Sequence, residues 1–251
     1  MRAAHELLHS RTRVRPRYAL LPLEGYPPSR LPAWPGVEAR ILASPALGAE
    51  FVQYLLNVPQ GLGTDQQGDG RVETFLYLLE GSATLSIDRK RAHHFAAGAF
   101  ALVPPAYDYR FEASEPCTLL TLRKAYEPAA GIDPPKPIIG DQSAVPAVVY
   151  MGNEGARLQT LLPDDLSLDL AMNIFTFSPG HSLPVVETHV MEHGLYFLQG
   201  KGVYYLDDAW MEVTAGDYVW MGPYVPQSFY ATGPVPSKYI YYKNVNRDIS
   251  L

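Results

Sequence analysis

The stretch ETFLYLLEG, residues 73–81, recurs as EHGLYFLQG, residues 192–200, and the two closing glycines are 119 residues apart. FVQYLLNVPQG (51–61) and AMNIFTFSPG (171–180) end on glycines with the same separation. GAFALVPP and GDYVWMGP form a third pair, whose glycines are 118 residues apart. Self-similarity at a fixed period indicates two copies of one structural module.

Both copies consist of short strand-like runs. These runs are rich in Val, Ile, Tyr, Phe and Leu, and Gly, Pro, Asp or Asn separate them, which is typical of antiparallel strands in a sandwich or barrel. The 23 prolines among 251 residues occur in short clusters, so few helices are expected. The sequence therefore predicts an all-β protein with a large hydrophobic core, since 47% of its residues are hydrophobic.

Several functional classes are disfavoured by composition. A net charge of -6 provides no basic surface for nucleic acid. Cys117 is the only cysteine, which excludes an intrachain disulfide and a thiolate zinc cluster. No apolar run approaches the length of a membrane span, so we expect no membrane partner and a cytoplasmic location.

Candidate metal ligands gather in VVETHVMEHG, residues 185–194. Glu187 and His189 are two residues apart, so on an extended strand they face the same side, and His193 keeps that parity. These three side chains can converge on one point. A solvated strand edge has the same composition, and the three residues alone leave both interpretations open.

The glycine spacing around this segment resembles the first cupin motif, a hairpin that carries His, His and Glu between two glycines. Glu187 stands in place of the first His, and His193 stands where the Glu of the motif belongs. The second cupin motif places its last metal-binding His eleven residues after an opening glycine, and Gln227 is eleven residues after Gly216. Two imidazoles, a carboxylate and an amide oxygen suit a divalent ion such as Mn, Fe or Zn.

The first copy lacks this ligand set. The repeat offsets place Gly68, Gly70, Thr74 and Tyr109 at the corresponding positions. Glycines and strand patterns recur in both copies, whereas the ligands occur in one. This difference favours a chemical role for the ligands and predicts that only the second copy binds metal.

The predicted architecture is a bicupin, two tandem double-stranded β-helix (jelly-roll) barrels with few short helices. Residues 1–40 are expected to form an N-terminal arm with a short amphipathic segment at AAHELLHS, and residues 41–128 an N-terminal cupin without metal. Residues 129–160, rich in proline, glycine and acidic residues, are expected to be a linker and the start of the second module. Residues 161–251 are expected to form the metal-binding cupin.

The last strand-like run, SKYIYYKNVNRD, places Tyr239, Tyr241 and Lys243 on one face by parity. If this face points into the barrel, it brings phenols and an ammonium toward the ion. A tyrosine-rich strand with a lysine in solvent fits the pattern equally well. Lys124 lies 119 residues before Lys243, which suggests that the lysine is partly a feature of the fold.

The second copy, with ETHVMEHG, GVYYLDDAW, GDYVWMGPYVPQ and YIYYKNVNRD, resembles the (S)-ureidoglycine aminohydrolase family of bicupins. The similarity extends over nearly the whole chain, including SPALGAEFVQYLL and GRVETFLYLLEG in the first copy. The resemblance implies a manganese-dependent hydrolase that converts (S)-ureidoglycine to (S)-ureidoglycolate and ammonia in purine (allantoin) catabolism. It also implies a homo-oligomer.

The resemblance further implies individual site residues. The metal ligands it implies are Glu187, His189, His193 and Gln227. Substrate contacts fall on Tyr204, Tyr239 and Lys243, and the catalytic roles on Glu187, Lys243 and Tyr239. Mn(2+) is the expected ion, and another divalent metal is the alternative.

Two other functional classes are compatible with the residues. One is a different metal-dependent cupin enzyme, a dioxygenase or an isomerase, that acts on a small organic acid or a sugar. The other is a ligand-binding bicupin without catalysis. In each case the expected partner is a small molecule.

Overall fold

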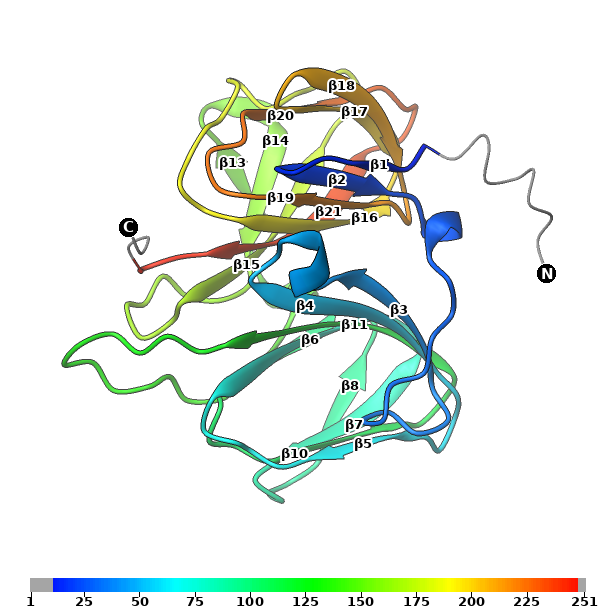
Figure 1. The fold of residues 1–251 in the computed structure, drawn as a ribbon, viewed down its shortest axis with the longest axis vertical. Helices are drawn as coiled ribbons and strands as arrows, with labels where there is room; N and C mark the ends of the chain where they lie inside the picture. Colours follow the sequence, from blue (N-terminus) through cyan, green and yellow to red (C-terminus); the bar gives the residue numbers. More distant parts are fainter. Residues whose placement is uncertain (1–10, 248–251) are drawn as a thin grey trace. The chain divides into compact units, whose positions relative to one another are not determined.

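The computed structural model describes residues 11–247, which form two compact units of β-strands (Figure 1). The N-terminal unit contains residues 27–145 and 164–169, and the C-terminal unit contains the described residues up to 26, residues 146–163 and residues from 170 onward. Three short 3-10 helices, Leu23–Gly25, Pro45–Leu47 and Gln142–Ala144, are the helical elements of the described part. The all-β cupin fold predicted from the sequence is confirmed. The AAHELLHS segment lies outside the described residues.

Two sheets build the C-terminal unit. The larger has the order β1-β2-β19-β16-β21-β15-β14-β13, and the smaller has the order β18-β17-β20. Figure 1 shows β17, β18 and β20 on one side of this unit and β16, β19 and β21 on the other. The strands are β1 (Arg13–Val14), β2 (Tyr18–Leu21), β13 (Val148–Tyr150), β14 (Asn153–Thr160), β15 (Leu170–Phe177), β16 (His193–Gln199), β17 (Lys201–Leu206), β18 (Ala209–Thr214), β19 (Tyr218–Met221), β20 (Gln227–Ala231) and β21 (Ser237–Asn244).

The N-terminal unit repeats this plan with sheets of order β12-β9-β6-β11-β4-β3 and β5-β10-β7-β8. The segments that recur in the sequence form central strands of the two large sheets. They lie in the strand orders β9-β6-β11-β4 and β19-β16-β21-β15. The strands are β3 (Glu38–Ala43), β4 (Phe51–Val58), β5 (Gly63–Gln66), β6 (Val72–Glu80), β7 (Ser82–Ile87), β8 (His93–Ala96), β9 (Ala99–Val103), β10 (Tyr109–Ala113), β11 (Cys117–Ala125) and β12 (Ile138–Asp141).

The repeated glycines that close β6 and β16 have a backbone reason. Gly81 has φ +82 and Gly200 has φ +78, which is the left-handed region that side chains disfavour. A Cβ at Gly81 would lie 2.3 Å from the carbonyl oxygen of Pro116, and a Cβ at Gly200 would lie 2.7 Å from that of Pro236. The same turn geometry and the same close approach therefore require glycine in both modules.

Residues 1–40 were expected to form one arm, and the described part of this stretch is divided between the units. β1 and β2 extend the large sheet of the C-terminal unit, with Leu20 opposite Val219 of β19. Trp34 is 3% exposed and lies in the hydrophobic core of the N-terminal unit. Within the expected linker, Ile138 of β12 pairs with Leu102 of β9. β1 and β2 therefore lie at one edge of the large sheet of the C-terminal unit, and β12 lies at one edge of the large sheet of the N-terminal unit.

Alternating side chains fill the space between the sheets. In the C-terminal unit Tyr204 and Leu206 of β17 point into the core, as do Phe229 and Ala231 of β20. Phe177 of β15 packs against Phe229, with ring centroids 5.0 Å apart. The candidate site lies where polar side chains, among them His193, Gln227 and Lys243, join this apolar core.

Strand register corrects one residue equivalence suggested by the constant repeat offset. Thr74 pairs with Arg123, whereas His193 pairs with Lys243. Arg123, and not Lys124, therefore occupies the place of Lys243 in the N-terminal unit. One additional residue in the second module, before its last strand, explains the shift.

A second equivalence changes for a similar reason. Glu187 forms a β-bridge with Gln227, and the residue that pairs with Tyr109 is Gln66. Gln66, and not Gly68, is thus the counterpart of Glu187, because the second module has two additional residues along this edge. The N-terminal unit has an amide at this position and no carboxylate.

No helix among residues 11–247 is long and apolar enough to cross a membrane.

Candidate metal and active site

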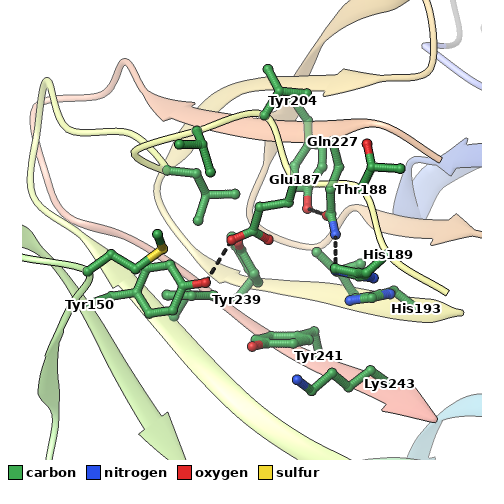
Figure 2. A pocket seen from close by; sticks show the side chains of 16 residues that line it. Tyr150, Glu187, Thr188, His189, His193, Tyr204, Gln227, Tyr239, Tyr241 and Lys243 are labelled. Atoms are coloured by element: carbon green, nitrogen blue, oxygen red, sulfur yellow. Dashed lines mark hydrogen bonds between the residues drawn. The ribbon is translucent and has the colours of Figure 1, made fainter. Parts of the chain in front are cut away.

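A cavity of about 410 Å³ opens into the C-terminal unit. Glu187, His189, His193, Tyr204, Gln227, Tyr239 and Lys243 all line it, so the structure brings together every residue expected from the sequence. Figure 2 shows their side chains directed into this common space. Apolar walls complete the cavity, formed in part by Phe175, Leu183 and Leu195.

Backbone pairing determines the positions of the Cα atoms from which these side chains extend. His193 opens β16 and pairs with Met221 of β19 on one side and with Lys243 of β21 on the other. Glu187 and Gln227 exchange two backbone hydrogen bonds, of 2.8 and 2.9 Å. Segments that are far apart in the sequence therefore meet at one end of the barrel.

The two imidazoles lie face to face, with ring centroids 4.7 Å apart and an interplanar angle of 23°. Burial lowers the pKa of His189, and burial together with the neighbouring His189 and Lys243 holds the pKa of His193 well below its ordinary value. The Nδ1 of His193 lies 3.2 Å from the carbonyl oxygen of Met191. When Nδ1–H donates to this carbonyl, the Nε2 lone pair is left for a ligand. Both rings are thus neutral at pH 7, as metal ligation requires.

Gln227 connects the imidazoles to a buried pair of tyrosines. Its Nε2 lies 3.3 Å from Nε2 of His189, and its Oε1 accepts a 2.6 Å hydrogen bond from Tyr204. Tyr204 is also hydrogen-bonded to Tyr239, and both phenols are almost fully buried. Burial raises the pKa of each phenol well above its ordinary value, so both stay protonated. In this orientation the amide oxygen accepts from a chain of neutral donors and the amide nitrogen faces His189.

The Glu187 carboxylate faces the same cavity, and its charge acts on Tyr204 and Tyr239. Its Oε1 accepts a 2.7 Å hydrogen bond from the hydroxyl of Tyr150. Within residues 11–247, no group of three His, Cys, Asp or Glu side chains is arranged so that it could hold a metal ion. The structure thus places the two imidazoles and the Gln227 amide next to one another, with the carboxylate turned toward Tyr150.

Lys243 supplies positive charge at the edge of the cavity. Its charge acts on both imidazoles, since it contributes to the lowered pKa of His189 and of His193. No carboxylate of the described residues forms an ion pair with its ammonium group. An anionic group of a small molecule could therefore pair with it.

Two further tyrosines line the cavity, and they differ in how far the sequence revealed them. Tyr241 stacks on His193 with centroids 5.9 Å apart, and parity had predicted that it shares a face with Tyr239 and Lys243. Tyr150 was missed, because it lies in the stretch expected to be a linker. The short run VVY offered a weak strand signal, and nothing in it indicated the direction of the ring.

The donor types that gather in the cavity suit a divalent ion, although the side chains are not arranged around one common point. They supply two neutral imidazoles, one amide oxygen and one carboxylate, and the buried Nδ1 of His189 has no hydrogen-bond partner within the described part of the chain. Rotation of the Gln227 amide by 180° exchanges its nitrogen and oxygen and would present the oxygen beside His189. The residues that could hold the ion are Glu187, His189, His193 and Gln227.

The lowered imidazole pKa values predict how the stability of the metal-free protein depends on pH. The unfolded chain binds protons on these histidines near pH 6.5, whereas the folded chain binds them only at lower pH. The free energy of unfolding should therefore fall as the pH drops below 6.5, by up to about 1.4 kcal/mol per pH unit for each histidine, and level off below the folded-state pKa values. Urea titrations of chelator-treated protein at several pH values measure this slope. His193→Asn should show a smaller slope, and equal slopes in the two proteins would contradict the prediction.

The fold and this cavity define a bicupin whose ligand-type residues gather in the C-terminal unit. A family model described as a cupin domain matches residues 173–242, within that unit. An (S)-ureidoglycine aminohydrolase from Escherichia coli (strain K12) is 36% identical over 239 residues, covering 93% of this chain and 90% of the relative. The chain belongs to the (S)-ureidoglycine aminohydrolase family.

Similarity over nearly the full length is found in other comparisons. An (S)-ureidoglycine aminohydrolase from Arabidopsis thaliana is 32% identical over 231 residues, which are 92% of this chain and 76% of the relative. Comparison with the crystal structure of protein Ylba from E. coli gives a TM-score of 0.85 at 34% sequence identity. The match covers 99% of this chain and 100% of that chain. Sequence and fold thus agree over both units.

Proposed function

We propose that this protein is a manganese-dependent enzyme that hydrolyses (S)-ureidoglycine to (S)-ureidoglycolate and ammonia in purine catabolism. The observation that carries the proposal is the meeting of seven expected site residues in one cavity, in a chain of this family. A homo-oligomeric state and a cytoplasmic location belong to the same proposal.

The chemistry of the cavity matches the groups of the substrate. Ureidoglycine carries a carboxylate, an amine and a ureido group on one carbon. The Lys243 ammonium would pair with the carboxylate, a charge-assisted contact that fixes the orientation of the molecule. The hydroxyl of Tyr239 and the ring of Tyr241 would flank the reacting carbon. The apolar walls limit the access of bulk water.

The reaction needs a group that accepts a proton from water and a group that returns one to the leaving ammonia. Glu187 is the carboxylate that lines the cavity, and its position allows it to perform both transfers in sequence. A bound divalent ion would supply Lewis acidity, which polarises a substrate group or acidifies water. In direct displacement, Glu187 would move a proton from the attacking water to the leaving amine. In elimination followed by hydration, it would first move the ureido N–H proton to the leaving amine and later move a proton from water to the imine nitrogen.

An ammonia-release assay tests the proposal. Freshly generated ureidoglycine is added to chelator-treated protein alone and to the same protein with Mn, Fe, Zn or Mg ions. We expect release of ammonia that depends on added metal and is fastest with Mn(2+). If no ammonia is released with any of these metals, the assignment is contradicted. Oxygen uptake with Fe(II) and a small organic acid would favour a dioxygenase instead.

A further inference from the structure

We propose that Tyr150 is a positioning residue that orients the Glu187 carboxylate for metal binding. The inference rests on the metal site of the proposed function and adds a residue from outside the two cupin motifs. Three features of the structure support it: an irregular strand pairing, a ring contact and a short hydrogen bond.

The backbone around Tyr150 is irregular in a way that sets the direction of its side chain. In the β13–β14 pairing, Val149 is opposite Arg157, but Tyr150 is opposite Asn153, so the register shifts between the two residues. Met151 and Gly152 follow with φ values of +46 and +76. Such bulges re-aim a side chain and often lie beside active sites. Here the shift turns Tyr150 into the cavity, at the turn that leads from β13 to β14.

Packing then restricts the ring. The ring of Tyr150 meets that of Phe175 edge to face, with centroids 4.8 Å apart and an interplanar angle of 83°. Phe175 is itself buried, and it stacks on Tyr241 at 5.5 Å. The phenol is therefore held against a rigid aromatic wall, and its hydroxyl has few alternative positions.

The hydroxyl donates to Oε1 of Glu187 at 2.7 Å. Figure 2 shows the carboxylate between Tyr150 and the two imidazoles, with the other carboxylate oxygen on the side of the imidazoles. Since a carboxylate has two acceptor oxygens, one can accept from Tyr150 while the other is offered to an ion.

This arrangement gives Tyr150 a defined energetic role. A ligating carboxylate is usually held by a further hydrogen bond, and loss of such a bond typically weakens metal binding 10- to 100-fold. Without the phenol, the Glu187 side chain would sample several rotamers, and binding of the ion would have to select one of them.

The test compares Tyr150→Phe with the wild type. The substitution removes one oxygen and keeps the ring on Phe175. Titration of chelator-treated protein with Mn(2+), followed by EPR of the free ion, measures Kd without any substrate. We expect Kd to increase about tenfold or more, and the EPR spectrum of the bound ion to change. A Kd equal to or below that of the wild type would overturn the inference.

Tyr205→Phe is the matched control. Tyr205 follows Tyr204 on β17, faces the other way and packs on Trp210, with centroids 5.3 Å apart. Its Kd should equal that of the wild type, and thermal unfolding checks that both variants fold. A Tyr150→Phe enzyme with normal Kd and a raised KM would mark Tyr150 as a substrate contact and reject the positioning role. Since binding is measured without substrate, failure of ammonia release in the wild type would reject the proposed function and leave this result unaffected.

Discussion

His193→Ala is expected to reduce the rate of metal-dependent ammonia release by about 100- to 1000-fold. The imidazole is 3% exposed, neutral and stacked between His189 and Tyr241. Its removal would eliminate a metal ligand, and Lewis-acid stabilisation by a bound ion amounts to several kcal/mol. Each 1.36 kcal/mol corresponds to a factor of ten in rate. Steady-state kinetics at saturating Mn(2+) give the rate, and a metal titration of the same variant gives the affinity.

The repeat provides a matched control for this substitution. Thr74 holds the place of His193 in the N-terminal unit, between Val103 and Arg123. Thr74→Ala changes a buried strand residue at the same position of the fold, and its ammonia release should stay within about twofold of the wild type because the proposed site residues all lie in the C-terminal unit. Full activity of His193→Ala at any metal concentration would remove this residue from the site.

Lys243→Met is expected to lower kcat/KM by about 10- to 100-fold, mainly through a higher KM. A hydrogen bond to a charged group contributes about 1.5–3 kcal/mol, and the ammonium has no carboxylate partner among the described residues. The effect of this substitution on the affinity for metal should be in the opposite direction. Because the positive charge of Lys243 acts on both imidazoles, its removal should leave Mn(2+) binding as tight as in the wild type or tighter.

Lys238→Met serves as the comparison for this second variant. Lys238 lies on the same strand, β21, opposite Thr176 and outside the cavity. Its kinetic constants should match those of the wild type. An unchanged KM in Lys243→Met would show that the lysine does not bind the substrate carboxylate. A loss of metal binding would contradict the expected effect of its charge on the imidazoles.

The repeat in the sequence predicted the fold because the features that recur are those that a cupin barrel requires. Gly81 and Gly200 adopt the same left-handed turn, and the strands before them are central in equivalent sheets. The constant offset failed where modules differ in length. One additional residue moved the counterpart of Lys243 from Lys124 to Arg123, and two additional residues moved the counterpart of Glu187 from Gly68 to Gln66.

The candidate site was predictable to the extent that its residues lie on regular strands. Parity alone placed Tyr239, Tyr241 and Lys243 on one face, and all three line the cavity. Tyr150 was not predictable, because its direction depends on a shift in strand register and on a contact with Phe175. Nor could sequence patterns show that the Glu187 carboxylate turns toward a phenol, since this depends on side-chain rotation.

The central claim is that Glu187, His189, His193 and Gln227 bind one divalent ion inside the C-terminal unit. Anomalous X-ray scattering from crystals grown with Mn(2+) tests it most directly. The account predicts one manganese peak within coordination distance of both imidazoles, the Glu187 carboxylate and the Gln227 side-chain oxygen. A manganese ion bound elsewhere, or one that leaves Gln227 and either imidazole uncoordinated, would contradict it.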